Sequence, residues 1–173
     1  ILKRMARRTT VEEIEEKISY MRKTLKNCYI RTSIIVGFPG ETDEHFNNLY
    51  EFTKRTRFDR MGVFTYSQEE STAAADFADQ VDEDIKAERY DKLMSLQQEI
   101  SLELNRAKIG TTLEVIVEGY DEDNYLFYGR SRGDSIDVDG KVYLGTEDEV
   151  MPGDIINVKI LDASEYDLTG QRV

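Results

Sequence analysis

The chain has one cysteine, one histidine and no tryptophan among its 173 residues. A single thiol, Cys28, excludes a disulfide within the chain and any metal site built from this chain's cysteines. We expect Cys28 to be a buried or half-buried thiol and His45 to be a surface residue. No apolar run approaches the roughly 18 residues that a membrane-spanning helix requires. The sequence therefore indicates neither a disulfide scaffold nor a membrane protein.

The start of the chain lacks the features of a secretory signal. It reads Ile-Leu-Lys-Arg-Met, with no apolar core segment, so a cytoplasmic setting is expected. Because the first residue is isoleucine and not methionine, we expect the sequence to begin inside a larger protein. Hydrophobic residues make up 39% and charged residues 34%, which is typical of a soluble and strongly charged globular protein.

Positive charge is scarce, above all in the C-terminal part. Residues 105–173 contain 15 Asp and Glu but only 7 Lys and Arg, a net charge of −8 out of −12 for the chain. Proteins that bind nucleic-acid backbones do so with Lys and Arg, and this part is poor in both. An acidic module favours a basic partner, including a basic protein. An acidic surface that only aids solubility is the alternative.

The most informative stretch is Arg-Thr-Ser-Ile-Ile-Val-Gly-Phe-Pro-Gly-Glu-Thr at residues 31–42. Its β-branched run at 34–36 predicts a parallel strand covered on both faces. The glycines and proline at 37–40 bend the backbone and leave room for a molecule to dock, and Thr42 can cap a helix. Ligands of α/β proteins lie beyond the carboxyl ends of parallel strands, so this turn is a candidate binding site. An ordinary connection between strand and helix is the alternative.

Two differently patterned regions follow one another along the chain. Residues 1–104 read as helix, strand, helix, strand and a final long helix, which predicts part of a parallel α/β sheet or barrel. Two strands cannot close a barrel, so this region resembles the last third or half of something larger. Residues 105–173 carry short alternating strands punctuated by glycines, which predicts a small all-β barrel.

Several segments together resemble the radical-SAM methylthiotransferases. They are Leu2–Met5, Arg8–Thr10, Ile35–Thr42, Arg57–Ser67 and the terminal β module. In that family a radical-SAM barrel, a partial TIM-like barrel, precedes a TRAM domain, a small OB-like antiparallel β-barrel. The resemblance implies that residues 1–104 are the C-terminal portion of the first barrel and residues 105–173 the TRAM domain. The chain departs from the family at 71–74, where Ser-Thr-Ala-Ala replaces the usual Gly-Thr-Pro-Ala.

Within the family, the stretch at 58–67 and the TRAM segment at 128–143 resemble the branch that acts on a small-subunit ribosomal protein. That branch adds a methylthio group to the β-carbon of an aspartate. A TRAM domain that holds tRNA is expected to be basic, whereas an acidic one suits a basic ribosomal protein. Six acidic residues in two expected loops are our candidates for docking that protein: Asp121, Glu122, Asp123, Asp134, Asp137 and Asp139.

The resemblance implies S-adenosyl-L-methionine and two 4Fe-4S clusters in the full-length enzyme. One cluster requires the motif CxxxCxxC, which this chain lacks, and Cys28 does not fit it. We therefore expect no bound cluster, no catalytic residue and no activity in this fragment alone. By resemblance the candidates for contact with S-adenosylmethionine are Val36, Gly37, Phe38, Pro39, Gly40, Glu41, Tyr66 and Ser67. For Glu41 we expect support of the helix start or of nearby backbone.

Two other functions remain open. A tRNA adenosine methylthiotransferase would use Arg130, Arg132 and Lys141, the nearby cations of the β module. A stand-alone OB-like binding module would have no catalytic context. Under the leading interpretation we expect a monomer, no membrane contact and no direct binding of nucleic acid by the acidic TRAM domain.

Overall fold

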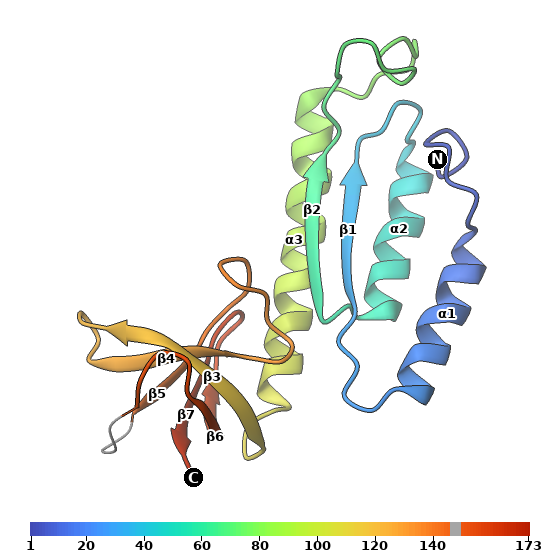
Figure 1. Ribbon diagram of the computed structural model, residues 1–173. Helices are drawn as coiled ribbons and strands as arrows, with labels where there is room; N and C mark the ends of the chain where they lie inside the picture. Colours follow the sequence, from blue (N-terminus) through green and yellow to red (C-terminus); the bar gives the residue numbers. More distant parts are fainter. Residues whose placement is uncertain (146–149) are drawn as a thin grey trace. The chain divides into compact units, whose positions relative to one another are not determined.

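The computed structural model describes residues 1–145 and 150–173. They form two compact units, Ile1–Gln97 and Gln98–Val173, and helix α3 (Glu83–Arg106) runs through the division (Figure 1). The domain boundary predicted at residue 104 falls near the end of α3 and stays a prediction. In the described part of the chain, no helix is both long enough and apolar enough to cross a membrane.

The first unit has the predicted order of helix, strand, helix and strand. Its elements are α1 (Val11–Thr24), β1 (Arg31–Val36), α2 (Asp43–Thr56), β2 (Arg60–Thr65) and the first part of α3. A capping box starts α1, because the Thr10 hydroxyl accepts a bond from the Glu13 amide (3.2 Å) and the Glu13 carboxylate accepts one from the Thr10 amide (3.0 Å). The second unit begins within α3.

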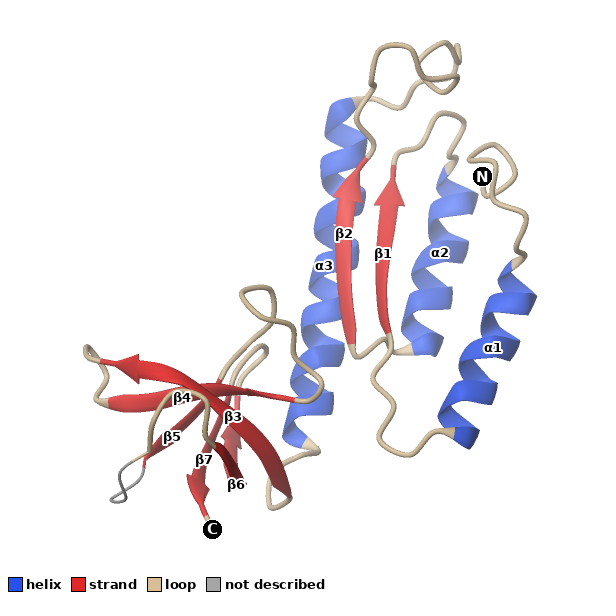
Figure 2. Ribbon diagram, viewed as in Figure 1, coloured by secondary structure: helices blue, strands red, loops and turns tan. Residues whose placement is uncertain are grey.

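Strands β1 and β2 pair in parallel, with Arg31 opposite Arg60 and Val36 opposite Thr65. Alternate residues such as Ile34 are buried, and Figure 2 shows α2 and α3 running alongside the two strands. The other face is open: Ile35 is 38% exposed and Phe64 57%. The prediction of a strand covered on both faces is therefore wrong for this chain, since helices cover one face only.

Helix α3 contributes the innermost residues of the first unit. Leu93 is fully buried and Leu96 nearly so, and the Gln97 amide donates a hydrogen bond to the Phe58 carbonyl (3.0 Å). Earlier in the helix, Lys86 and Arg89 are also buried, with 3% and 5% exposure. Two cations on the inner stripe of a helix require partners, because burying an unpaired charge is costly.

The second unit is a closed five-stranded barrel with the strand order β3–β4–β5–β7–β6. Its strands are β3 (Thr112–Asp121), β4 (Leu126–Ser131), β5 (Val142–Gly145), β6 (Ile155–Ala163) and β7 (Leu168–Arg172). The small all-β barrel predicted from the sequence is confirmed. Four pairings are antiparallel as expected, and the pairing of β5 with β7 is parallel.

Branched aliphatic side chains fill the interior of this barrel. The buried set is Val115, Val117, Val142, Leu144, Val150, Ile156, Val158, Ile160 and Leu168. Alternate residues of each strand point inward, so Ile156 and Val158 of β6 are buried while Ile155 and Asn157 are exposed. A barrel of this size is filled by side chains, and its binding surfaces must lie on its outside and in its loops.

Candidate functional site

The turn after β1 is the centre of the candidate site. Gly37 and Gly40 have positive φ angles of 72° and 83°, which glycine adopts without strain. Gly37, Phe38 and Pro39 are buried, and the amide of Glu41 closes the turn on the Phe38 carbonyl (2.9 Å). The turn thus has a defined shape at the carboxyl end of the strand.

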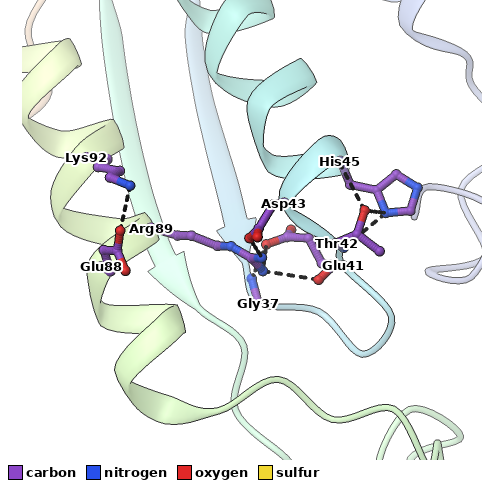
Figure 3. A network of polar contacts seen from close by, with 8 residues as sticks. All are labelled: Gly37, Glu41, Thr42, Asp43, His45, Glu88, Arg89 and Lys92. Atoms are coloured by element: carbon purple, nitrogen blue, oxygen red, sulfur yellow. Dashed lines mark hydrogen bonds and ion pairs between the residues drawn. The ribbon is translucent and has the colours of Figure 1, made fainter.

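Glu41 holds this shape from inside. Its Oε1 accepts a hydrogen bond from the Gly37 amide (2.8 Å) and another from Nη1 of Arg89 (2.9 Å). Both side chains are buried, with 3% exposure for Glu41 and 6% for Arg89. Figure 3 shows Arg89 reaching from α3 to this carboxylate. Glu41 therefore supports the backbone of the turn, and its own charge is balanced by a cation from α3.

The same guanidinium also binds the start of α2. Its Nη2 lies 2.8 Å from Oδ1 of Asp43, and Nη1 donates to the Glu41 carbonyl (3.2 Å). Thr42 caps this helix, where its hydroxyl accepts a bond from the His45 amide (3.3 Å) (Figure 3). Sequence reasoning did not single out Arg89. The sequence did contain a sign that Arg89 is buried. Residue 89 lies one helical turn before Leu93, on the same stripe of the predicted helix.

The two glycines of the turn lie against the chain's own side chains. A Cβ atom at Gly37 would collide with the stem of Lys86, and one at Gly40 would collide with Arg4 and Asp79. We predicted that these glycines leave room for a docking molecule. In the structure Gly37 leaves room for Lys86 of α3 and Gly40 for the Arg4–Asp79 pair, and contact of either glycine with a bound molecule stays a prediction.

The segment at 68–82 lies over the turn through Asp79 and Phe77. The Gly40 amide donates to the Asp79 carbonyl (2.8 Å), and Arg4 binds the Asp79 carboxylate through both terminal nitrogens (2.6 and 2.7 Å). Arg4 also lies 4.7 Å above the Phe77 ring, which contacts Phe38 edge to face. The hydrogen bonds from Arg4 lower the pKa of Asp79 and raise that of Arg4.

Tyr66 and Ser67 follow the end of β2 beside the turn. The Tyr66 amide donates to the Val36 carbonyl (2.9 Å), and the Tyr66 ring packs edge to face on Phe38 with centroids 5.2 Å apart. Its hydroxyl is buried and has no hydrogen-bond partner among the described residues. Such an atom fits a site for a polar group of a bound molecule. Ser67 is exposed, and its hydroxyl donates to Glu69 (2.8 Å).

The first acidic loop of the barrel joins β3 to β4. Asp121 is half-buried and accepts hydrogen bonds from the Asp123 and Asn124 amides (3.1 Å each) and from the Asn124 side chain (2.9 Å). These bonds, the Asn124 side chain foremost, lower the pKa of Asp121. Asp121 therefore shapes the loop, whereas Glu122 and Asp123 are exposed.

The second acidic loop follows β4, and it too contains both carboxylates that accept hydrogen bonds within the loop and an exposed carboxylate. Asp134 is 8% exposed and accepts bonds from the Ser131 amide (3.1 Å) and hydroxyl (2.6 Å). Asp139 is half-buried and accepts from the Ser135 amide (2.6 Å). Only Asp137 of the three is exposed, and its neighbours Ile136 and Val138 are exposed apolar residues.

The cations considered for RNA binding are partly engaged within the barrel. Arg130 Nε lies 2.6 Å from the Glu118 carboxylate, which offsets its charge. The Lys141 ammonium lies 3.9 Å above the Tyr128 ring, and Arg132 is exposed. Among the described residues no group of three or more His, Cys, Asp or Glu is arranged to hold a metal ion. Cys28 is a half-buried free thiol, and His45 is exposed, as expected.

Comparison with known proteins supports the resemblance. Residues 109–173 match the TRAM domain family. The chain is 49% identical over 98% of its length to the ribosomal protein uS12 methylthiotransferase RimO of Clostridium botulinum strain Hall, and 48% identical over 99% to that of Geobacter sulfurreducens. The protein of the same name from Clostridioides difficile is 46% identical over 98% of the chain.

These matches cover only part of the relatives. The chain spans 38% of the length of each of these three proteins. The predicted TRAM domain is confirmed, and so is the resemblance of this chain to the methylthiotransferases over nearly its whole length.

Proposed function

We propose that this chain is the C-terminal part of an enzyme that adds a methylthio group to the β-carbon of an aspartate in ribosomal protein uS12. The observation that carries the proposal is the identity of 46–49% over nearly the whole chain to proteins named for uS12 methylthiotransfer. Two features of the structure support it, namely the shaped turn after β1 and the acidic loops of the barrel.

S-Adenosyl-L-methionine and two 4Fe-4S clusters would supply the radical and sulfur chemistry of the complete enzyme. This chain has one cysteine, so it cannot supply the cluster ligands and is inactive by itself. The buried, unpartnered hydroxyl of Tyr66 fits a polar group of S-adenosylmethionine or of the substrate peptide. Val36 to Glu41 would present backbone beside that group, and Ser67 would lie at its edge.

The open face of β1 and β2 also suits a larger protein. Ile35 and Phe64 expose apolar surface on a sheet of only two strands, whose edges can accept further strands. In the complete enzyme, additional strands would extend the sheet, and this face would line the interior of the barrel. The relatives are long enough to contain such strands, since this chain is 38% of their length.

The barrel would dock the basic substrate protein through its exposed carboxylates. Glu122, Asp123 and Asp137 are the exposed members of the six acidic candidates. The other three candidates accept hydrogen bonds from backbone amides of the loops, so their role is to shape the two loops; they are Asp121, Asp134 and Asp139. The net charge of −8 in this part favours encounter with a basic protein.

Binding of the chain to purified uS12, measured by calorimetry at two salt concentrations, tests the docking role. We expect affinity that falls with salt, and we expect Glu122→Lys/Asp123→Lys/Asp137→Lys to weaken binding about 10-fold or more and to flatten the salt dependence. Equal affinity for uS12 in the triple variant and the unchanged chain would refute docking through these residues.

A matched control separates local contacts from overall charge. The variant Glu99→Lys/Glu114→Lys/Asp162→Lys makes the same change in net charge at exposed positions of the second unit outside the two acidic loops. We expect it to weaken uS12 binding much less than the loop variant. An equal effect of both variants would mean that net charge, and not the loops, attracts the partner.

The tRNA alternative is tested in the same experiment. Because Arg130 is paired with Glu118 and Lys141 lies on Tyr128, we expect no measurable binding of tRNA at physiological salt. Binding of tRNA but not uS12 would favour the tRNA-modifying alternative. For the reaction itself, the complete enzyme should convert uS12 to a methylthiolated product that mass spectrometry detects on an aspartate.

A further inference from the structure

Arg89 lies where three segments of the first unit meet. From α3 it contacts Glu41 in the turn and Asp43 in the first turn of α2. Its guanidinium carbon also lies 5.6 Å above the ring of Phe46, on the next turn of α2. Figure 3 shows the side chain reaching from α3 toward Glu41 and Asp43, with Gly37 next to its end.

The contact requires a guanidinium. One nitrogen, Nη1, donates to the Glu41 carboxylate and carbonyl, while the other, Nη2, donates to Asp43. A planar fork can serve these acceptors together because its donors diverge at fixed angles. A lysine ammonium is a single point charge and would reach one of the two carboxylates at a time.

The contact also reaches the backbone of Gly37. Oε1 of Glu41 accepts both from Arg89 and from the Gly37 amide, so the contact with Arg89 keeps this carboxylate aimed at the turn. Gly37 has φ of 72° and follows directly on Val36, the last residue of β1. The backbone conformation at the head of the turn therefore depends on a side chain more than 50 residues later in the chain.

We propose that Arg89 is a positioning residue for the S-adenosylmethionine site: through Glu41 it holds the turn at 37–41 in the form that binds the adenosyl group. This inference rests on the proposed function. Arg89 itself touches no cofactor. Without Arg89 the Glu41 carboxylate is buried with no cation and leaves the turn, and the backbone at Gly37 then has several conformations in place of one.

The test uses the complete enzyme that carries this chain and S-adenosylhomocysteine as the probe, with affinity measured by calorimetry. We expect Arg89→Met and Arg89→Lys to weaken binding of the probe about 10-fold or more, a loss of about 1.4 kcal/mol or more. The KM for S-adenosylmethionine should rise more than kcat falls. Affinity for uS12 should be unchanged, because the acidic loops lie in the other unit.

Two further variants distinguish positioning from simple loss of stability. In Glu41→Gln/Arg89→Met the buried charge is removed, while the glutamine oxygen can still accept from Gly37, so we expect affinity for the probe to recover at least in part. Lys92→Met removes an exposed ion pair with Glu88 one turn further along α3 and should leave affinity unchanged (Figure 3).

The outcomes separate the two proposals. Failure of the unchanged enzyme to bind S-adenosylhomocysteine would overturn the proposed function. Binding by the unchanged enzyme and equally by folded Arg89→Met would overturn the positioning role alone. If Arg89→Met does not fold, Arg89→Lys and the double variant decide: wild-type affinity in Arg89→Lys, or no recovery in a folded double variant, contradicts the inference.

Discussion

Removal of Arg89 should destabilise the first unit far more than removal of both partners of its ion pair. In Arg89→Met the Glu41 carboxylate, only 3% exposed, loses its cation. Breaking a buried pair in this way typically costs about 3–5 kcal/mol, because one charge stays buried without compensation. The contact with Asp43 adds little to this figure, since the Asp43 side chain is 92% exposed and screened by water.

The double variant Glu41→Gln/Arg89→Met should have a free energy of unfolding much closer to that of the unchanged chain. It buries no charge and retains an acceptor for the Gly37 amide, so we expect a cost of about 1–2 kcal/mol. Glu41→Gln alone leaves the guanidinium paired with Asp43, and its loss of stability should lie between that of Arg89→Met and that of the double variant. The double-mutant cycle should thus give a coupling energy of at least about 3 kcal/mol between residues 41 and 89.

Amide hydrogen exchange measured by mass spectrometry is the suitable assay, because it reports each unit separately. A loss of about 3 kcal/mol corresponds to an exchange rate about 100-fold faster in peptides of β1 and α2. Peptides of the barrel should exchange at unchanged rates and serve as an internal reference. Lys92→Met, which removes a pair that is 56% and 63% exposed, should cost less than about 0.5 kcal/mol. The reasoning fails if Arg89→Met and the double variant are equally destabilised.

Three further predictions concern other parts of the chain. Leu144→Ala removes a fully buried side chain of the barrel and should lower the free energy of unfolding of the barrel, measured in urea, by about 2–5 kcal/mol. A free energy of unfolding near that of the unchanged chain would contradict this expectation. Gly129→Ala places a methyl group against the Ile116 carbonyl, so we expect a clear fall in the melting temperature of the barrel, and an unchanged temperature would show that the strands yield. Arg4 lowers the pKa of Asp79. At pH values above the usual pKa of aspartate the contact therefore stabilises the segment at 68–82, and this stabilisation is lost as the pH falls through the lowered pKa. Arg4→Ala should raise the pKa of Asp79 toward about 3.9 in an NMR titration, and an unshifted pKa would contradict the pairing.

Local patterns in the sequence predicted the elements well. The β-branched run at 34–36 marked the strand β1, and the glycines and proline at 37–40 marked the passage from β1 to α2. The alternating strands after residue 110 predicted the small barrel. These features depend on residues close together in the chain, whose backbone preferences and periodicity can be read directly.

Roles that depend on distant partners could not be read in the same way. Asp134 and Asp137 are both acidic residues of one loop, yet one is buried against Ser131 and the other is exposed. Gly37 and Gly40 were expected to make room for a ligand, and they make room for Lys86 and for Arg4 with Asp79. The sequence states the residue type at each position but not the residue that lies opposite.

The sequence by itself determined the order of helices and strands, the acidic character of the barrel and the family that the chain resembles, because each follows from local pattern, charge or motif. The tertiary structure alone decided that Arg89 of α3 binds Glu41 and so holds Gly37. Residues 37, 41 and 89 are brought together only when α3 packs along the strands. A buried carboxylate then requires a cation at that place, and the packed helix supplies it.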